Sequence, residues 1–283
     1  MRRTGYLMVA ILAACALAAL DAGVASAELP EIGRCVKVEG TKEGHRTKFN
    51  GKYSNKKCTT VSSTGTGKFE WMAGPGEEKG FESPGTLEPV TLETPSGTAV
   101  VCKDSKQFGE YLGPNTEKDE ISLYECTLST TGETCQSVRP EEIPPLPEAG
   151  TIISQALEGK LGYIKKSALK PQIGWEYKAK TGPFLFIFEC GSTPLVTTDI
   201  TIEGAFISPI IKPVNRMAEE YKLHSVAAGG KQTPEMFEGG AKATLTAAIL
   251  EPKALKATTE AIAFSAPEEE QSFSEDMEFK AAP

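Results

Sequence analysis

The segments FLFIFEC (184–190) and VTTDITIE (196–203) alternate their side chains with a period of two residues. In 196–203 the apolar and β-branched positions alternate with polar ones, which is the pattern of a strand with one face in water. In 184–190 both alternating sets are apolar, so this strand is expected to be covered on both sides. We therefore expect 184–190 to lie in the core of a β-sheet protein.

Similar short segments, separated by turns rich in glycine and proline, recur along the chain. Many short strands with frequent tight turns indicate an all-β fold with mainly antiparallel sandwich or barrel-like sheets and little helix. A solvated turn is expected at 268–270. The other expected strands are 35–38, 68–72, 87–92, 99–102, 110–112, 121–128, 151–154, 174–178, 243–248, 255–264 and 277–280.

The first 27 residues have the features of a secretory signal peptide. Two arginines precede an uncharged run over 6–20, and Val24-Ala25-Ser26-Ala27 places small residues where a signal peptidase cuts, after Ala27. Asp21 interrupts the apolar run before it is long enough to span a membrane. A bacterial lipobox ending at Cys15 is the alternative, and it would leave the protein anchored by a lipid. Otherwise the mature chain is expected to be secreted, with no membrane span.

The rest of the chain divides at a proline-rich stretch. Residues 139–148 contain four prolines, each without an amide hydrogen for a strand ladder. We expect an extended connector here, between an N-terminal β subdomain (28–138) and a C-terminal β subdomain (149–283).

Loss of Cys15 with the signal peptide leaves six cysteines, an even number that favours disulfides in an exported protein. Cys126 and Cys135 flank a turn-rich stretch and are expected to form a local bridge. Cys35 and Cys58 flank a loop rich in glycine and lysine and are the next local pair. By elimination, Cys102 is expected to join Cys190 across the connector.

The composition argues against several kinds of function. The formal net charge of −8 makes nucleic acid an unfavourable partner. The chain has two histidines, His45 and His224, which limits nucleophilic catalysis and zinc binding; we expect both to be bystanders, with no metal and no cofactor.

The composition does not exclude catalysis by paired carboxylates, because glycoside hydrolysis needs only two acids across a groove. Glu70 lies beside Trp71, and Glu176 lies between Trp175 and Tyr177, so these five residues are candidate sugar contacts. In a strand, however, neighbouring side chains point to opposite faces, which favours buried rings and solvent-facing acids.

Several short motifs give the chain a resemblance to known proteins. It resembles a large set of paralogous, exported, cysteine-containing proteins of high-GC Gram-positive bacteria that have no assigned function. This resemblance implies export and a bacterial cell-surface setting, and it carries over no catalytic residue. The motifs that carry it are GRCVKV (33–38), GKYSN (51–55) leading to Cys58-Thr59, GKFEW (67–71), LEGKLG (157–162), FECG (188–191) and KQTPEMFEGG (231–240).

These observations favour a secreted or cell-surface, non-catalytic protein that binds a cell-wall glycan or a surface protein. One alternative is a carbohydrate-active hydrolase that uses paired carboxylates. The other is a self-assembling structural component of the cell surface.

Overall fold

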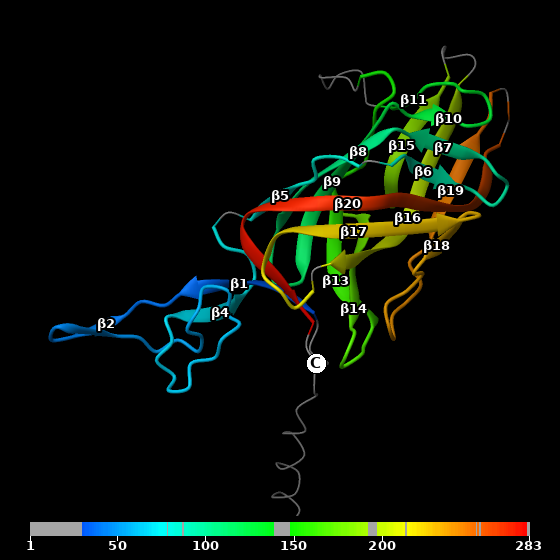
Figure 1. Cartoon of the computed structure of the whole chain (residues 1–283). Helices are drawn as coiled ribbons and strands as arrows, with labels where there is room; N and C mark the ends of the chain where they lie inside the picture. The colour runs from blue at the N-terminus through cyan, green and yellow to red at the C-terminus, as the bar shows by residue number, and fades with distance from the viewer. Residues whose placement is uncertain are drawn as a thin grey trace, which may run out of the picture.

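The computed structural model describes residues 30–77, 79–86, 88–138, 148–191, 197–212, 214–252, 254 and 256–281. The protein is all-β, with 61% strand, 0% helix and antiparallel pairing, which confirms the expected fold class (Figure 1). The signal peptide with Ala27, the alternative lipid site at Cys15 and residues 139–147 of the connector lie outside the described residues. No helix in the described ranges has the length and apolar character needed to cross a membrane.

Eight strands form a closed ring, which we call ring one. Each strand pairs antiparallel with the next, and the last strand pairs with the first through Ser272 opposite Glu82. In order around the ring they are β5 (Gly80–Glu82), β8 (Asp104–Tyr111), β9 (Thr116–Tyr124), β13 (Leu157–Lys165), β14 (Gln172–Ala179), β16 (Thr198–Lys212), β17 (Ala218–Ala228) and β20 (Thr258–Lys280).

A second closed circuit, ring two, shares β16 and β20 with ring one. A single bridge between Thr127 and Thr134 links its neighbours β10 and β11. In order, ring two contains β6 (Val90–Glu93), β7 (Ala99–Cys102), β10 (Thr127–Leu128), β11 (Cys135–Ser137), β15 (Phe184–Cys190), β16, β19 (Leu245–Leu250) and β20.

The two shared strands pass from one ring to the other. Residues 198–204 of β16 pair within ring two, and residues 205–212 pair within ring one. Gly204, at the change of partners, has a φ of 113°, and a Cβ there would lie 2.1 Å from the Thr244 carbonyl oxygen. Only glycine adopts this conformation without strain, so Gly204 allows the strand to change partners.

Six further strands complete the fold. β1 (Glu31–Lys37) pairs with the end of β20 and with β4 (Phe69–Ala73), while β12 (Ile152–Ile153) pairs with β9 and β18 (Lys231–Thr233) with β17. β2 (Thr41–Glu43) and β3 (Arg46–Lys48) form a separate hairpin that projects away from the two rings (Figure 1). Strands from both sides of the expected connector therefore pair in one sheet, for example β9 with β13.

The disulfides confirm one expected pairing and correct two. Cys35 bonds Cys58 as expected, whereas Cys102 bonds Cys126 and Cys135 bonds Cys190. The strand register explains the correction, because it places Cys102, Cys126, Cys135 and Cys190 opposite one another in a single row across four strands. The expected bridge between Cys102 and Cys190 would join the ends of this row, about 14 Å apart at three strand spacings, which is too far for a disulfide. The Cys135–Cys190 bridge does span the connector in sequence.

The core residues follow the alternation seen in the sequence. In β16, Thr198, Ile200 and Ile202 are buried, while the residues between them are more exposed. In β15, residues on both faces are buried, which agrees with a strand covered on both sides. Ring one contains a cluster of aromatic rings in mutual contact, formed by Phe81, Tyr111, Trp175, Tyr221, Phe273 and Phe279.

Candidate functional site

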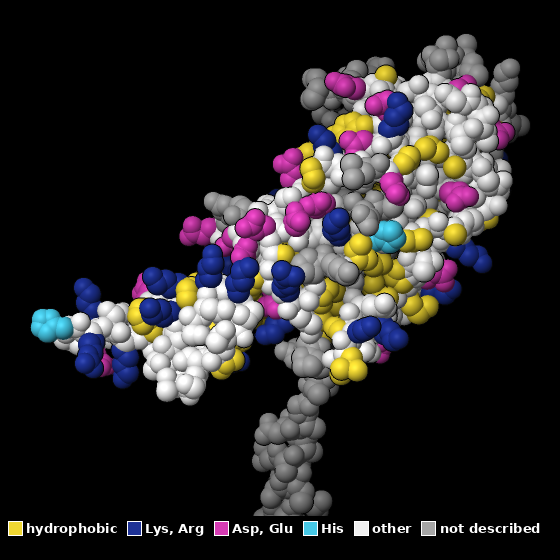
Figure 2. Space-filling model, in the orientation of Figure 1, with side chains coloured by type: hydrophobic (Ala, Val, Ile, Leu, Met, Phe, Trp, Pro, Cys, Tyr) yellow, Lys and Arg dark blue, Asp and Glu magenta, His cyan; other side chains and the backbone are white. Residues whose placement is uncertain are grey.

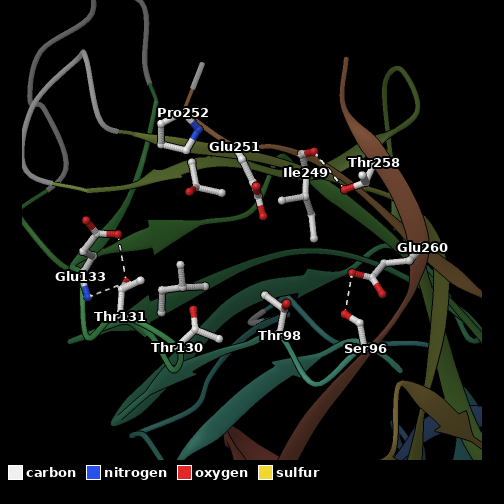
Figure 3. A pocket seen from close by; sticks show the side chains of 12 residues that line it. Ser96, Thr98, Thr130, Thr131, Glu133, Ile249, Glu251, Pro252, Thr258 and Glu260 are labelled. Carbon is white, nitrogen blue, oxygen red and sulfur yellow. Dashed lines mark hydrogen bonds between the residues drawn. The ribbon is translucent and has the colours of Figure 1, made fainter. Parts of the chain in front are cut away.

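A cavity of about 740 Å³ lies at one end of ring two, among two tight turns and the adjoining strand ends (Figure 3). Its volume is in the range of small-ligand pockets. Its walls come from the β6–β7 turn, the β10–β11 hairpin, the start of β16, the end of β19 and the start of β20. The lining residues are Ser96, Thr98, Leu128, Thr130, Thr131, Glu133, Thr198, Ile249, Glu251, Pro252, Thr258 and Glu260.

Two tight turns shape this cavity. In the β6–β7 turn the amide of Thr94 donates to the Thr98 carbonyl (2.9 Å), and Gly97 has a φ of 90°. In the β10–β11 hairpin the amide of Gly132 donates to the Leu128 carbonyl (2.7 Å), with a φ of 74° at Gly132. Both glycines occupy the left-handed region that other residues rarely adopt, so the local sequence specifies these turns.

The chemistry of the cavity is acidic and rich in hydroxyl groups. Glu133, Glu251 and Glu260 lie on three sides of it (Figure 3). The Thr131 hydroxyl donates to Glu133 (2.9 Å), and the Ser96 hydroxyl donates to Glu260 (3.0 Å), so two of the three carboxylates are oriented by neighbouring side chains. Among the described residues that line the cavity, none is a lysine, arginine, histidine or aromatic residue.

This arrangement suits binding better than nucleophilic chemistry. A carboxylate accepts hydrogen bonds and attracts cations, so the cavity is complementary to ammonium or guanidinium groups. No lining residue is a histidine that could activate one of the hydroxyl groups. Within the described ranges, no group of three or more histidine, cysteine or acidic side chains could hold a metal ion.

A second polar cluster lies inside ring one. Glu117 and Asp119 are both buried on the inner face of β9. Asp119 accepts hydrogen bonds from the Gln107 side chain and from the amide of Glu120 (2.7 Å). Gln107 in turn accepts a hydrogen bond from Gln271 (3.0 Å). This chain of amides gives Asp119 the partners that a buried carboxylate needs.

Glu117 is less well satisfied than Asp119. Burial, followed by the charge of Asp119, raises the pKa of Glu117 well above 4.5, and the nearby Tyr177 hydroxyl opposes part of this rise. Neither carboxylate oxygen makes a hydrogen bond of ordinary geometry within the described residues. Gly159 lies directly opposite, and a Cβ there would be 2.6 Å from Glu117 Cγ, so glycine leaves the space that this side chain occupies. These features favour the protonated form of Glu117 inside ring one.

The structure separates the five candidate sugar contacts. Trp175 and Tyr177 are fully buried inside ring one, while Glu176, between them, is only partly buried. The aromatic side chains of Trp175 and Tyr177 are therefore inaccessible to a sugar at the surface, as the alternation of side chains in a strand predicts. No acid and ring of this segment share a face.

Trp71 and Glu70 lie on β4, beside the root of the projecting hairpin. The Trp71 ring packs against Gly33 and is covered by Lys280, whose Nζ lies 4.3 Å from the ring centre. Glu70 accepts a hydrogen bond from the amide of Lys52 (2.8 Å). β4 pairs with β1, whereas Glu176 lies on β14 between β13 and β16, so the two acids are on separate parts of the sheet.

The two histidines also lie apart. His45 occupies the turn of the β2–β3 hairpin and is exposed, while His224 is half-buried on β17. Neither residue lines the cavity.

Sequence reasoning missed both polar sites. The residues that line the cavity come from segments spread over residues 96–260, so no local sequence pattern predicts it. Glu117 and Asp119 did leave a signal, because they occupy the same alternating set as the buried Ile121 and Leu123. That alternation assigns both acids to the inner face.

Comparisons of the chain with protein-family models, with curated proteins and with solved structures give no match. The resemblance to exported proteins of high-GC Gram-positive bacteria therefore stays an expectation.

Proposed function

We propose that this chain is an exported, non-catalytic binding protein, and that the cavity at the end of ring two is its ligand site. The signal peptide expected from the sequence supports export, and the three disulfides indicate an oxidising environment. The proposal rests on one observation: an acidic cavity of about 740 Å³, in which hydroxyl groups hold two of the three carboxylates in place.

The lining favours a ligand with positively charged hydrogen-bond donors. The described lining residues include three carboxylates and neither a lysine nor an arginine, and their negative field attracts ammonium and guanidinium groups. Glycan sites commonly use an aromatic platform, and the lining has none. The ligand class we propose is therefore a basic segment of a protein.

A binding experiment with the mature protein tests this proposal. Short peptides rich in lysine and arginine, matched neutral peptides and neutral oligosaccharides are titrated by isothermal calorimetry. The basic peptides should bind, and binding should weaken in the variant carrying Glu133→Gln, Glu251→Gln and Glu260→Gln. A variant with Glu82→Gln and Glu120→Gln, two exposed acids outside the cavity lining, is the matched control.

Two outcomes would reject the proposal. If the basic peptides bind the wild-type protein and the cavity variant equally well, the cavity is not their site. If the mature protein hydrolyses glycoside substrates, the alternative of a carbohydrate-active hydrolase is supported and the non-catalytic assignment fails.

A further inference from the structure

The segment from Lys37 to Lys68, which we call the arm, projects from ring one as the β2–β3 hairpin and an adjoining loop (Figure 1). Apart from Gly51 and Gly67, none of its residues is buried, and every residue of β2 and β3 is exposed. The arm therefore adds little to the hydrophobic core. Its size and exposure need another explanation.

The arm is strongly basic, although the protein as a whole is acidic. It contains eight lysines and arginines and two glutamates, a net charge of +6, and subtracting this from the −8 of the whole chain leaves −14 for the rest. Figure 2 shows Lys and Arg side chains gathered along the arm and acidic side chains spread over the body. The protein is thus charged oppositely at its arm and over its body.

The arm is held in shape by its own contacts. The Cys35–Cys58 bridge ties its loop to β1. The Asn55 side chain accepts hydrogen bonds from the amides of Thr59 (3.0 Å) and Thr60 (3.1 Å). A preorganised segment loses less conformational entropy when it binds, so this order favours a binding role.

The tip of the arm is electrostatically separate from the body. The seven residue steps from Lys37 to Gly44, of which Thr41–Glu43 form a strand, span at most about 23 Å. This is more than twice the Debye length of about 8 Å at physiological ionic strength. The field at the tip is therefore set by Lys42, Glu43, Arg46 and Lys48, a net charge of +2, rather than by the acidic body.

The acidic cavity lies at the other end of the molecule. In Figure 1, β2 projects on one side of ring one, and the cavity strands β6, β7, β10 and β19 lie in ring two on the opposite side. The hairpin carries Lys42, Arg46 and Lys48 around a tight turn, together with Glu43, which forms an ion pair with Lys48 (3.7 Å), and the cavity presents three carboxylates. Because the two lie at opposite ends, the arm cannot reach the cavity of its own chain, but it can reach the cavity of a second molecule.

We propose that the β2–β3 hairpin of one molecule binds the acidic cavity of a second copy of this chain. This inference rests on the proposed function and names the basic ligand. Because the two contact surfaces differ and lie at opposite ends, the interface is head-to-tail, so each added molecule leaves one free arm and one free cavity until a ring of molecules closes.

Sedimentation velocity of the mature protein over a range of concentrations tests the assembly. The mean mass should rise with concentration at low ionic strength and return to that of the monomer at high ionic strength, because salt screens the contacts. A monomer under all these conditions would overturn the inference. The proposed function would still stand if basic peptides bind the cavity.

Two neutralised variants identify the contact surfaces. The arm variant carries Lys42→Gln, Arg46→Gln and Lys48→Gln, and the cavity variant carries Glu133→Gln, Glu251→Gln and Glu260→Gln. Each alone should weaken self-association by about tenfold, because exposed ion pairs each contribute a fraction of a kcal/mol. A matched control with Lys165→Gln, Lys180→Gln and Lys231→Gln should assemble like the wild type.

Mixing the two variants gives the sharpest result. One variant keeps an intact cavity and the other an intact arm, so at a concentration where each variant alone stays monomeric the mixture should form a 1:1 dimer. Growth of the cavity variant alone with the concentration dependence of the wild type would place the arm on another acidic face and reject the assignment. Binding of dextran sulfate by the arm, without self-association, would give the arm a different anionic partner and also reject it.

Discussion

Replacing Glu117 with glutamine tests whether the carboxyl group inside ring one keeps its proton in the folded protein. Glutamine has nearly the same shape and cannot ionise. Unfolded, the carboxyl group has a pKa of about 4.5, and folding raises this pKa through burial and the charge of Asp119. Above pH 4.5, the folded state therefore holds a proton that the unfolded state has lost.

The sign and size of the effect follow from this difference. The contribution of Glu117 to stability is fully present below pH 4.5 and is lost as pH rises towards its folded pKa. Over that interval one proton lowers the free energy of unfolding by about 1.4 kcal/mol per pH unit. Glu117→Gln should remove this slope and make the protein more stable than the wild type at neutral pH.

Urea unfolding at a series of pH values measures both quantities, with Glu120→Gln, an exposed acid on the same strand, as the control. The slope of stability against pH should become more positive by about 1.4 kcal/mol per unit in Glu117→Gln from about pH 5 upward, and it should not change in the control. If Glu117→Gln keeps the wild-type slope, or is less stable at neutral pH, Glu117 is ionised in the folded protein and the reasoning is wrong.

Three further changes test other parts of the structure. Replacing both cysteines of the Cys135–Cys190 bridge with alanine should lower the free energy of unfolding by about 4 kcal/mol, because the bridge closes a loop of 55 residues. Thermal unfolding measures this loss, and a smaller loss would contradict the prediction. Gly159→Ala should lower the free energy of unfolding by about 1–3 kcal/mol, because the added methyl group crowds the buried Glu117 side chain. Unchanged urea unfolding would show that Glu117 does not need the space beside Gly159. Hydrogen bonds from Lys118 and then Lys79 lower the pKa of Glu110 to about 2, so its stabilising effect should persist above pH 4.5 and be lost as pH falls towards 2. In Lys118→Gln, an NMR titration should find this pKa higher, and no change would contradict the assigned cause.

Local patterns in the sequence predicted many of the strands but not their partners, and they missed β13 (Leu157–Lys165) of ring one. The alternation over 198–203 identified the buried face of β16, because the two faces of a strand follow directly from residue order. The partner change at Gly204 depends on strands distant in sequence, so the alternation alone could not reveal it.

β20 shows the same limit in a different way. The sequence suggested strands at 255–264 and 277–280 with a solvated turn at 268–270, whereas one strand runs from Thr258 to Lys280. The acidic stretch remains extended because it pairs with β17 and closes ring one. Pairing between distant strands therefore overrides the local preference of these residues for a turn.

The candidate site depends even more strongly on tertiary structure. Cys102, Cys126, Cys135 and Cys190 fall in one row only once the strand register is known, so sequence separation ranked their pairings incorrectly. The acidic cavity likewise exists only where ring two closes and brings Ser96 close to Glu260.

β20 also runs between the two ends of the molecule and can transmit force from one to the other. Its first residues, Thr258 and Glu260, line the cavity, and its last residues, from Met277 to Lys280, pair with β1 at the root of the arm. One continuous strand of 23 residues thus connects the two ends. Tension applied between the arm and the cavity passes from β1 to β20 through their ladder and then along the β20 backbone, and it loads the flanking ladders in shear, where many hydrogen bonds resist together. A chain of such molecules would be strongest along the direction in which it grows.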